Sequence, residues 1–183
     1  NKVRNENTDA HFDMFYEAFL PEYTVKDWVL FVEAFPRSYD EFINLYGYND
    51  DEFELALLYH EANDHIEFLF SDDRILEPVC LDMLIKLTHG FYWQADAAAS
   101  LRMHIQSMLK DHPDLMSTFL KDKDDYLVKD FLKCAISTPH PEPENTVYYN
   151  EYLKLVEQYK NRSPKIVRLF KAAHKELVDE WRE

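Results

Sequence analysis

The chain contains only two glycines, Gly47 and Gly90, in 183 residues. Most β-rich and α/β folds of this length need more glycines, because their tight turns use backbone with positive φ. Glycine-rich phosphate loops, dinucleotide fingerprints and the nucleophile elbow of α/β-hydrolases need glycines a few residues apart. The sequence therefore predicts an all-α protein without a nucleotide site of the usual kinds.

Long apolar runs and a balancing share of basic residues are also missing. No run approaches the roughly 18 apolar residues of a membrane-spanning helix, so we expect a soluble chain without membrane insertion. Asp and Glu number 35 against 20 Lys and Arg, and the formal net charge is −15. Such a charge repels phosphate backbones, so we expect no nucleic acid; a basic protein is the partner it favours. The alternative is that the acids form solvated helix faces.

Cysteine is as scarce as glycine. Cys80 and Cys134 lie among apolar neighbours, which suits either buried free thiols or a single disulfide. They are too far apart in sequence for a C-x-x-C zinc motif, and we expect no cofactor. The compartment stays open between the cytoplasm and export after removal of an N-terminal signal.

Helix signals follow one another with short gaps. Ser38 and Glu41 form a capping box, and we expect Gly47 to end that helix as a left-handed C-cap. Pro113 and Pro164 suit first helical positions, the latter after Ser163 as N-cap. Periodicity and caps predict helices over residues 8–20, 24–35, 38–47, 51–70, 75–90, 94–111, 113–120, 126–136, 147–161 and 164–183. Helices this short and close predict packed antiparallel helical hairpins.

The chain divides into three segments of one domain. Residues 1–137 form a helical body whose N-terminal part is acidic and rich in aromatic residues. Residues 138–146 have prolines at alternate positions, which favours an extended linker. Residues 147–183 form a C-terminal helical hairpin that we expect to dock on the body.

Charge differs along these segments. Residues 1–75 hold 18 acidic and 5 basic residues, a net of −13, and the rest of the chain has a net of −2. Between Tyr159 and Lys175 there are six Lys and Arg and no acid. We expect this basic stretch either to fold back toward the acidic part or to pair head-to-tail in a homo-oligomer.

Two stretches echo each other. Residues 68–85 and 119–136 both read Phe-Leu, then paired Asp, then an apolar helix with a cysteine. The two stretches are 51 to 54 residues apart. This spacing resembles the repeat period of HEAT or armadillo proteins, which stack helical hairpins with a period of about 40–47 residues. This resemblance implies a short HEAT-like α-α superhelix as the finer form of the fold.

The hexapeptide HEANDH, residues 60–65, resembles the zinc signature H-E-x-x-H with one extra residue. On a helix its two histidines lie about 140° apart and point to different sides. The helical spacing predicts a core face made of Leu55, Leu58, Ala62, Ile66 and Leu69, with His65 at its border. We interpret both histidines as ordinary helix residues. The alternative is an enzyme or metal site assembled from Glu61, His65, His89 and His104 on neighbouring helices.

Tyrosines stand beside carboxylates in residues 44–54. Rings can anchor a protein partner while acids steer a basic surface toward them. The interface candidates are Tyr46, Tyr48, Asp50, Asp51, Glu52 and Glu54. The alternative is that these rings belong to the core. We expect a non-enzymatic protein-interaction module, either a scaffold or an immunity or inhibitor protein that masks a basic partner.

Overall fold

The computed structural model describes residues 25–49, 54–93, 97–138, 141 and 146–182. The predicted helix over residues 8–20 and most of the linker lie outside this part. The helices are α2 (Val25–Ala34), α3 (Tyr39–Tyr46), α4 (Ala62–Leu69), the 3-10 helix η1 (Asp73–Leu76), α5 (Pro78–Leu87), α6 (Ala97–Asp111), α7 (Pro113–Leu120), α8 (Asp125–Ile136), α9 (Thr146–Tyr159) and α10 (Pro164–Arg182). Strands β1 (Tyr48–Asn49) and β2 (Glu54–Leu55) form a short antiparallel pair. The all-α class is confirmed.

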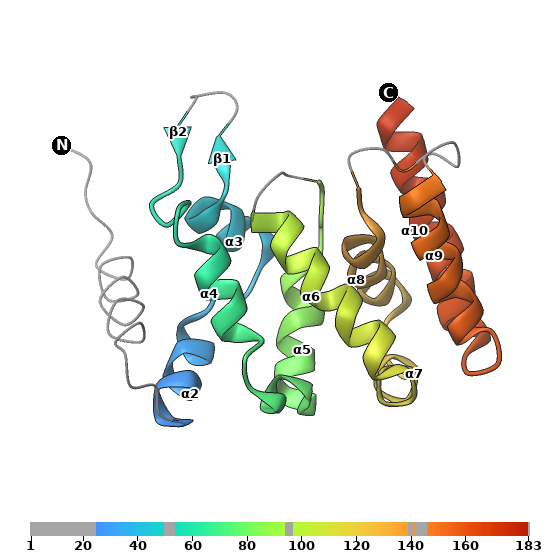
Figure 1. The fold of residues 1–183 in the computed structure, drawn as a ribbon, viewed down its shortest axis with the longest axis horizontal. Helices are drawn as coiled ribbons and strands as arrows, with labels where there is room; N and C mark the ends of the chain where they lie inside the picture. Colours follow the sequence, from blue (N-terminus) through green and yellow to red (C-terminus); the bar gives the residue numbers. More distant parts are fainter. Residues whose placement is uncertain (1–24, 50–53, 94–96, 139–140, 142–145, 183) are drawn as a thin grey trace.

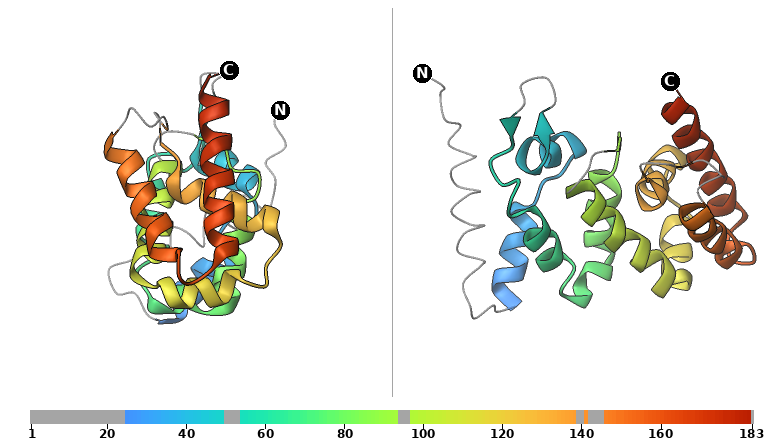
Figure 2. Two further views of the ribbon diagram at one scale, coloured as in Figure 1. Left: turned by 90° about the vertical axis from the view of Figure 1, so that its right-hand side faces the viewer. Right: turned by 45° about the horizontal axis from the view of Figure 1, so that its top comes forward.

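The helices form two rows that run along the molecule in chain order (Figure 1). In one row α4 contacts α6, which contacts α7 and α9. In the other row α3 contacts α5, α5 contacts α8, and α8 contacts α10. Contacts of α6 and α9 with α8, and of α9 with α10, join the rows. The helices α2, α3 and α4 therefore lie at one end and the α9–α10 hairpin at the other, as the right-hand view in Figure 2 also shows.

Local capping chemistry explains where several helices begin. Ser38 Oγ accepts the Glu41 N–H (3.2 Å), and the Glu41 carboxylate accepts the Arg37 N–H (2.8 Å), so donors at the start of α3 are satisfied. Ser163 Oγ accepts the Ile166 N–H (3.3 Å) at the start of α10. Proline occupies an early position of α7, where it costs no hydrogen bond.

The predicted helix over residues 51–70 is wrong in its first half. Residues 54–55 pair with β1, and α4 begins only at Ala62. The Ala56 N–H donates to Gly47 O (3.0 Å) and the Leu58 N–H to Leu45 O (2.9 Å), so this segment is bonded to the end of α3 and does not form a continuous helix of its own. Leu55 is consequently 47% exposed, outside the core face that the pattern predicted.

The predicted left-handed cap at Gly47 is also wrong. Gly47 has φ −87° and ψ −172°, an extended conformation, because the chain passes directly from α3 into β1. The glycine with positive φ is Gly90, at +77°, in the turn after α5. Its N–H donates to the Asp130 carboxylate of α8 (3.0 Å), so the turn is held against the neighbouring helix of its row.

The interior changes in character along the molecule. Aromatic rings fill the end formed by α2 and α3, where the buried members are Trp28, Phe31, Phe35, Tyr39, Phe42 and Tyr46. Trp28 Nε1–H donates to Leu69 O (3.1 Å), which joins α2 to the end of α4. Aliphatic side chains dominate α5 and α6. Cys80 in α5 and Cys134 in α8 are both buried and free, so the two cysteines do not form a disulfide.

The basic stretch of the C-terminal hairpin packs against the chain itself. Arg162 bonds Asp114 (2.7 Å), while Arg168 (2.5 Å) and Lys165 (3.2 Å) both reach Asp125. These two acids belong to α7 and α8. The basic stretch was expected to fold back toward the acidic residues 1–75, but the partners of these three residues in the described part are the acids of α7 and α8. None of the described helices has the length and apolar character to cross a membrane.

Candidate protein-interaction surface

Tyr46 and His65 form a buried pair inside the aromatic end. Tyr46 is 0% exposed and His65 is 3% exposed, and Tyr46 Oη lies 3.0 Å from His65 Nδ1. The Phe31 ring meets the imidazole edge-on at 5.7 Å. Burial lowers the pKa of His65 to about 4, although nearby Asp64 acts in the opposite direction. His65 is therefore a core residue and not a border residue of α4.

This burial corrects the surface interpretation of Tyr46, because a ring without exposure offers nothing to a partner. Of the other interface candidates, Tyr48 is half-buried and Glu54 is exposed on β2. Asp50, Asp51 and Glu52 lie outside the described residues. The predicted interface at the hairpin therefore reduces, in the described part, to Tyr48 and Glu54.

The four residues of the alternative metal or catalytic site have separate surroundings. Glu61 is exposed before α4, whereas His65 is bonded to Tyr46. His89 Nδ1 lies 2.9 Å from the Asp130 carboxylate, and the His104 ring stacks on Phe70 at 4.6 Å. Across the described ranges, no three His, Cys, Asp or Glu side chains gather closely enough to hold a metal ion. His65, His89 and His104 each have a different local partner, and the metal-binding form of the alternative therefore has no support among the described residues.

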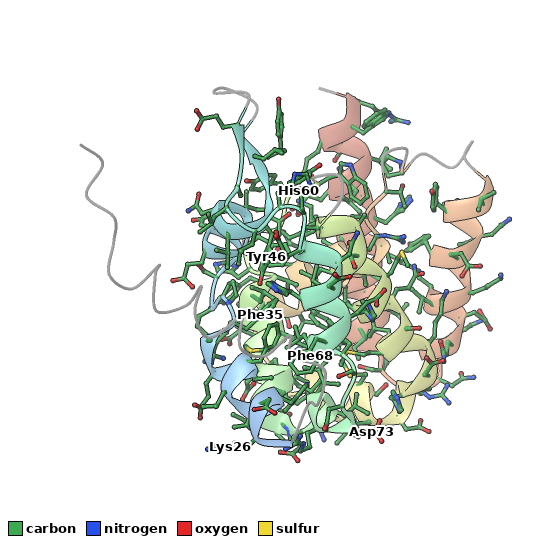
Figure 3. The ribbon with its side chains drawn as sticks, turned by 60° about the vertical axis from the view of Figure 1, so that its left-hand side comes forward. Lys26, Phe35, Tyr46, His60, Phe68 and Asp73 are labelled. Carbon is green, nitrogen blue, oxygen red and sulfur yellow. The ribbon has the colours of Figure 1, made fainter. Side chains whose placement is uncertain are left out.

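An acidic ridge runs along the solvent side of α4. We define it as Glu61, Asp64 and Glu67, together with Asp73 of η1, and all four are exposed. The three residues at and within α4 are spaced i, i+3, so they lie on neighbouring turns of one helix side. Figure 3 labels His60 and Asp73, which lie toward opposite ends of α4, with Tyr46, Phe35 and Phe68 in the interior near it.

The ridge belongs to a larger set of unneutralised acids. Among the described residues up to position 77, nine exposed acids form no ion pair with a described Lys or Arg side chain: Glu33, Asp40, Glu41, Glu54, Glu61, Asp64, Glu67, Asp73 and Glu77. The sequence already indicates such a set, because no Lys or Arg occurs between Arg37 and Arg74. Apart from Asp72, which pairs with Arg74, the described acids of this stretch form no ion pair with a described Lys or Arg side chain.

A hollow adjoins the ridge between η1 and the last turns of α6. It has a volume of about 140 Å³. Its lining comprises Phe70, Asp72, Asp73, Ile75, Leu76, His104, Ser107, Met108, Asp111 and His112. The Phe70 and His104 rings are nearly parallel, with 11° between their planes. Burial lowers the pKa of His104, and the nearby charge of Glu67 acts in the opposite direction. A carboxylate of the ridge is therefore close enough to influence a residue that lines the hollow.

One carboxylate of the hollow is already engaged. Asp72 accepts the Arg74 backbone N–H (2.9 Å) and two guanidinium donors (2.8 and 2.7 Å). These hydrogen bonds lower the pKa of Asp72 to about 2. The Arg74 guanidinium also lies 4.6 Å from the centre of the Trp28 ring. Asp73 and Asp111 have no such partner among the described residues.

Comparison with known proteins adds no assignment, since no family model, curated protein or solved structure matches this chain.

Proposed function

We propose that this protein is a non-enzymatic helical interaction module that binds a basic protein through the acidic ridge of α4 and the surface around it. The observation that carries the proposal is the set of nine exposed acids that form no ion pair with a described Lys or Arg side chain. Unpaired like charges repel one another and attract cations over a distance of several ångströms. A basic partner surface would relieve that repulsion and be steered toward the ridge.

The partner that fits best is a different protein and not a second copy. The basic side chains of the C-terminal hairpin are the obvious source of positive charge in this chain. Arg162, Lys165 and Arg168 already form ion pairs with Asp114 and Asp125. Moving them onto the ridge of another copy would first break these pairs. A head-to-tail homo-oligomer is therefore the weaker form of the proposal.

The arrangement of helices supports the same kind of role. Two rows of short helices, each contacting its neighbours along the chain, are what a HEAT-like superhelix would provide. Folds of that kind present extended surfaces to protein partners. A scaffold and an immunity or inhibitor protein that masks a basic enzyme are the two biological roles that this surface would serve.

The test is affinity capture from the native host with a charge-matched pair of variants. The ridge variant is Asp64→Lys with Glu67→Lys. The control is Asp122→Lys with Asp124→Lys, which changes net charge equally at exposed acids that form no ion pair in the described part. Bound proteins are identified by mass spectrometry at about 0.1 M and about 1 M salt, where the screening length falls from about 10 Å to about 3 Å.

We expect one basic protein to bind the wild type and the control at low salt, and to be lost from the ridge variant and at high salt. Equal capture by wild type and ridge variant would show that the acids of α4 only keep the protein in solution.

A further inference from the structure

We infer that the hollow between η1 and the end of α6 receives an arginine side chain of the basic partner. This inference rests on the proposed function and names the contact that would fix the position of the partner on the acidic ridge. It uses three properties of the hollow, which are its size, the charge on its walls and its aromatic side.

The size selects a side chain over a free small molecule. The hollow measures about 140 Å³, whereas pockets for drug-sized ligands measure roughly 300–1,000 Å³. It is open to solvent between two elements, so a side chain projecting from a protein surface can enter it. Ile75, Leu76 and Met108 supply apolar lining, which suits the methylene stem of a long side chain.

The charge on the walls selects a cation. Asp73 comes from η1 and Asp111 from the last residue of α6, so carboxylates stand on both elements that form the hollow. Neither forms an ion pair with a described residue, and the nearby Arg74 is held by Asp72. The C-terminal end of a helix also carries a partial negative charge, which adds to the attraction at Asp111.

The aromatic side selects arginine over lysine. Phe70 and His104 line the hollow with two aromatic rings, which stack on each other. A guanidinium is planar, stacks on such rings and offers donors in several directions, so it can reach carboxylates on two elements. An ammonium is a compact and more strongly hydrated charge that gains less from such rings. Arg74 over Trp28 shows the same kind of contact within this chain.

The experiment uses capped amino acids as probes of the full chain. N-acetyl-arginine amide is titrated into the ¹⁵N-labelled protein and followed by ¹H–¹⁵N correlation spectra, with N-acetyl-lysine amide and N-acetyl-citrulline amide in parallel. Citrulline keeps the shape of arginine and lacks its charge. The hollow variant is Asp73→Asn with Asp111→Asn, and the control is Asp122→Asn with Asp124→Asn. All four acids are exposed, so both variants are expected to fold, which circular dichroism checks.

We expect arginine amide to shift amides in residues 70–76 and 104–112, and citrulline amide to leave them unmoved. The hollow variant should weaken arginine binding about tenfold, the effect of losing about 1.4 kcal/mol of charge-assisted hydrogen bonding, while the control should leave it unchanged. Absence of these shifts, equal shifts with citrulline, or lysine binding as tightly as arginine would each overturn the inference.

Partner capture separates this inference from the proposed function. If the ridge variant loses the basic partner while the hollow variant keeps it, the interaction module stands and the arginine contact falls. If the ridge variant keeps the partner, the proposed function falls, whatever the probes do at the hollow. Loss of the partner from both variants, with arginine shifts at the hollow of the wild type, supports both.

Discussion

At the N-terminal end of the described chain, the exposed carboxylates of α3, α4 and η1 face solvent with few basic partners, whereas from α7 onward most described acids form ion pairs, Asp122 and Asp124 being the exceptions. Apart from Arg74 with Asp72, the described ion pairs join residues between positions 82 and 180. On α8, Lys129 and Lys133 bind Glu176, and Lys133 also binds Glu180. The paired acids Glu176 and Glu180 join α10 to α8, whereas the unpaired acids make no such contact between described helices.

The interiors of the two ends differ in a matching way. Beneath the unpaired acids lies a cluster of aromatic rings, which can hold α2, α3 and α4 together without help from surface charge. At the other end, Lys133 is only 4% exposed and depends on two glutamates. The comparison teaches that an end whose interior is filled with aromatic rings can leave most of its carboxylates unpaired, whereas the end that buries Lys133 needs carboxylates beside that charge.

The largest effect should follow from breaking the aromatic cluster. Phe31 packs against Phe35, His65 and Phe68 at ring distances of 5.6, 5.7 and 4.9 Å. Replacing Phe31 by Ala should cost about 3–5 kcal/mol of unfolding free energy, because it leaves a cavity. Urea unfolding measures the loss, and Tyr126→Ala, at a ring 54% exposed, should cost less than about 1 kcal/mol.

Hydrogen exchange on Phe31→Ala shows where that loss falls. Amide protection should drop most in α2, α3 and α4 and least in α10. Uniform loss along the chain would mean that the two ends are not distinct in stability.

The next largest effect should be a loss of unfolding free energy at acidic pH, caused by protonation of His65. Its pKa is near 4 in the folded protein, against about 6.5 in the unfolded chain. The unfolded state therefore binds more protons between these values, and the stability present above pH 6.5 is lost as pH falls: about 2 kcal/mol by pH 5 and about 3 kcal/mol by pH 4. His104 and His174, whose pKa values burial also lowers, add smaller losses of the same sign.

Unfolding free energies at several pH values test this. His65→Gln should flatten the slope between pH 6.5 and 4, and exposed His60→Gln should keep it. The ion pairs of Glu151 should stay intact down to pH 4, because hydrogen bonds from Lys110 and Lys154 lower the pKa of Glu151 to about 2. An unchanged slope in His65→Gln would place the acid sensitivity elsewhere.

The smallest of the three effects concerns the buried lysine. Burial opposes the charge of Lys133, but hydrogen bonds to Glu180 and Glu176 outweigh it and raise its pKa. Lys133→Met removes the cation and leaves both glutamates behind, one still bonded to Lys129. Because these glutamates are partly exposed, we expect a loss of about 2 kcal/mol, below the 3–5 kcal/mol typical of fully buried pairs. Lys154→Met, at an exposed pair, should change stability by less than about 0.5 kcal/mol, and equal losses in both would contradict the comparison.

Local chemistry made much of the fold predictable. Ser38, Ser163 and the prolines at 113 and 164 carry their signals within a turn of the helix they begin, and those helices are where the sequence placed them. The segment from residue 54 to residue 61 was mispredicted because its apolar spacing fits a helix. Its backbone instead bonds to Gly47 and Leu45, and no helical spacing reveals such contacts.

The candidate surface was harder to predict than the fold. A surface depends on which neighbours a residue lacks, and sequence shows only the neighbours along the chain. Tyr46 reads as an interface anchor beside the acids that follow it, yet its hydroxyl meets His65 in the core. The ridge was foreseeable from the long stretch without Lys or Arg. The hollow was not, because it joins η1 to the end of α6 across the fold.

The thiols at the middle of the molecule have a kinetic consequence. Cys80 and Cys134 lie on the contacting helices α5 and α8, and burial raises the pKa of both thiols. A thiol reacts as its thiolate and only when reagent can reach it. The rate at which these two cysteines are alkylated therefore reports how often the centre of the helix stack opens, independently of fraying at either end.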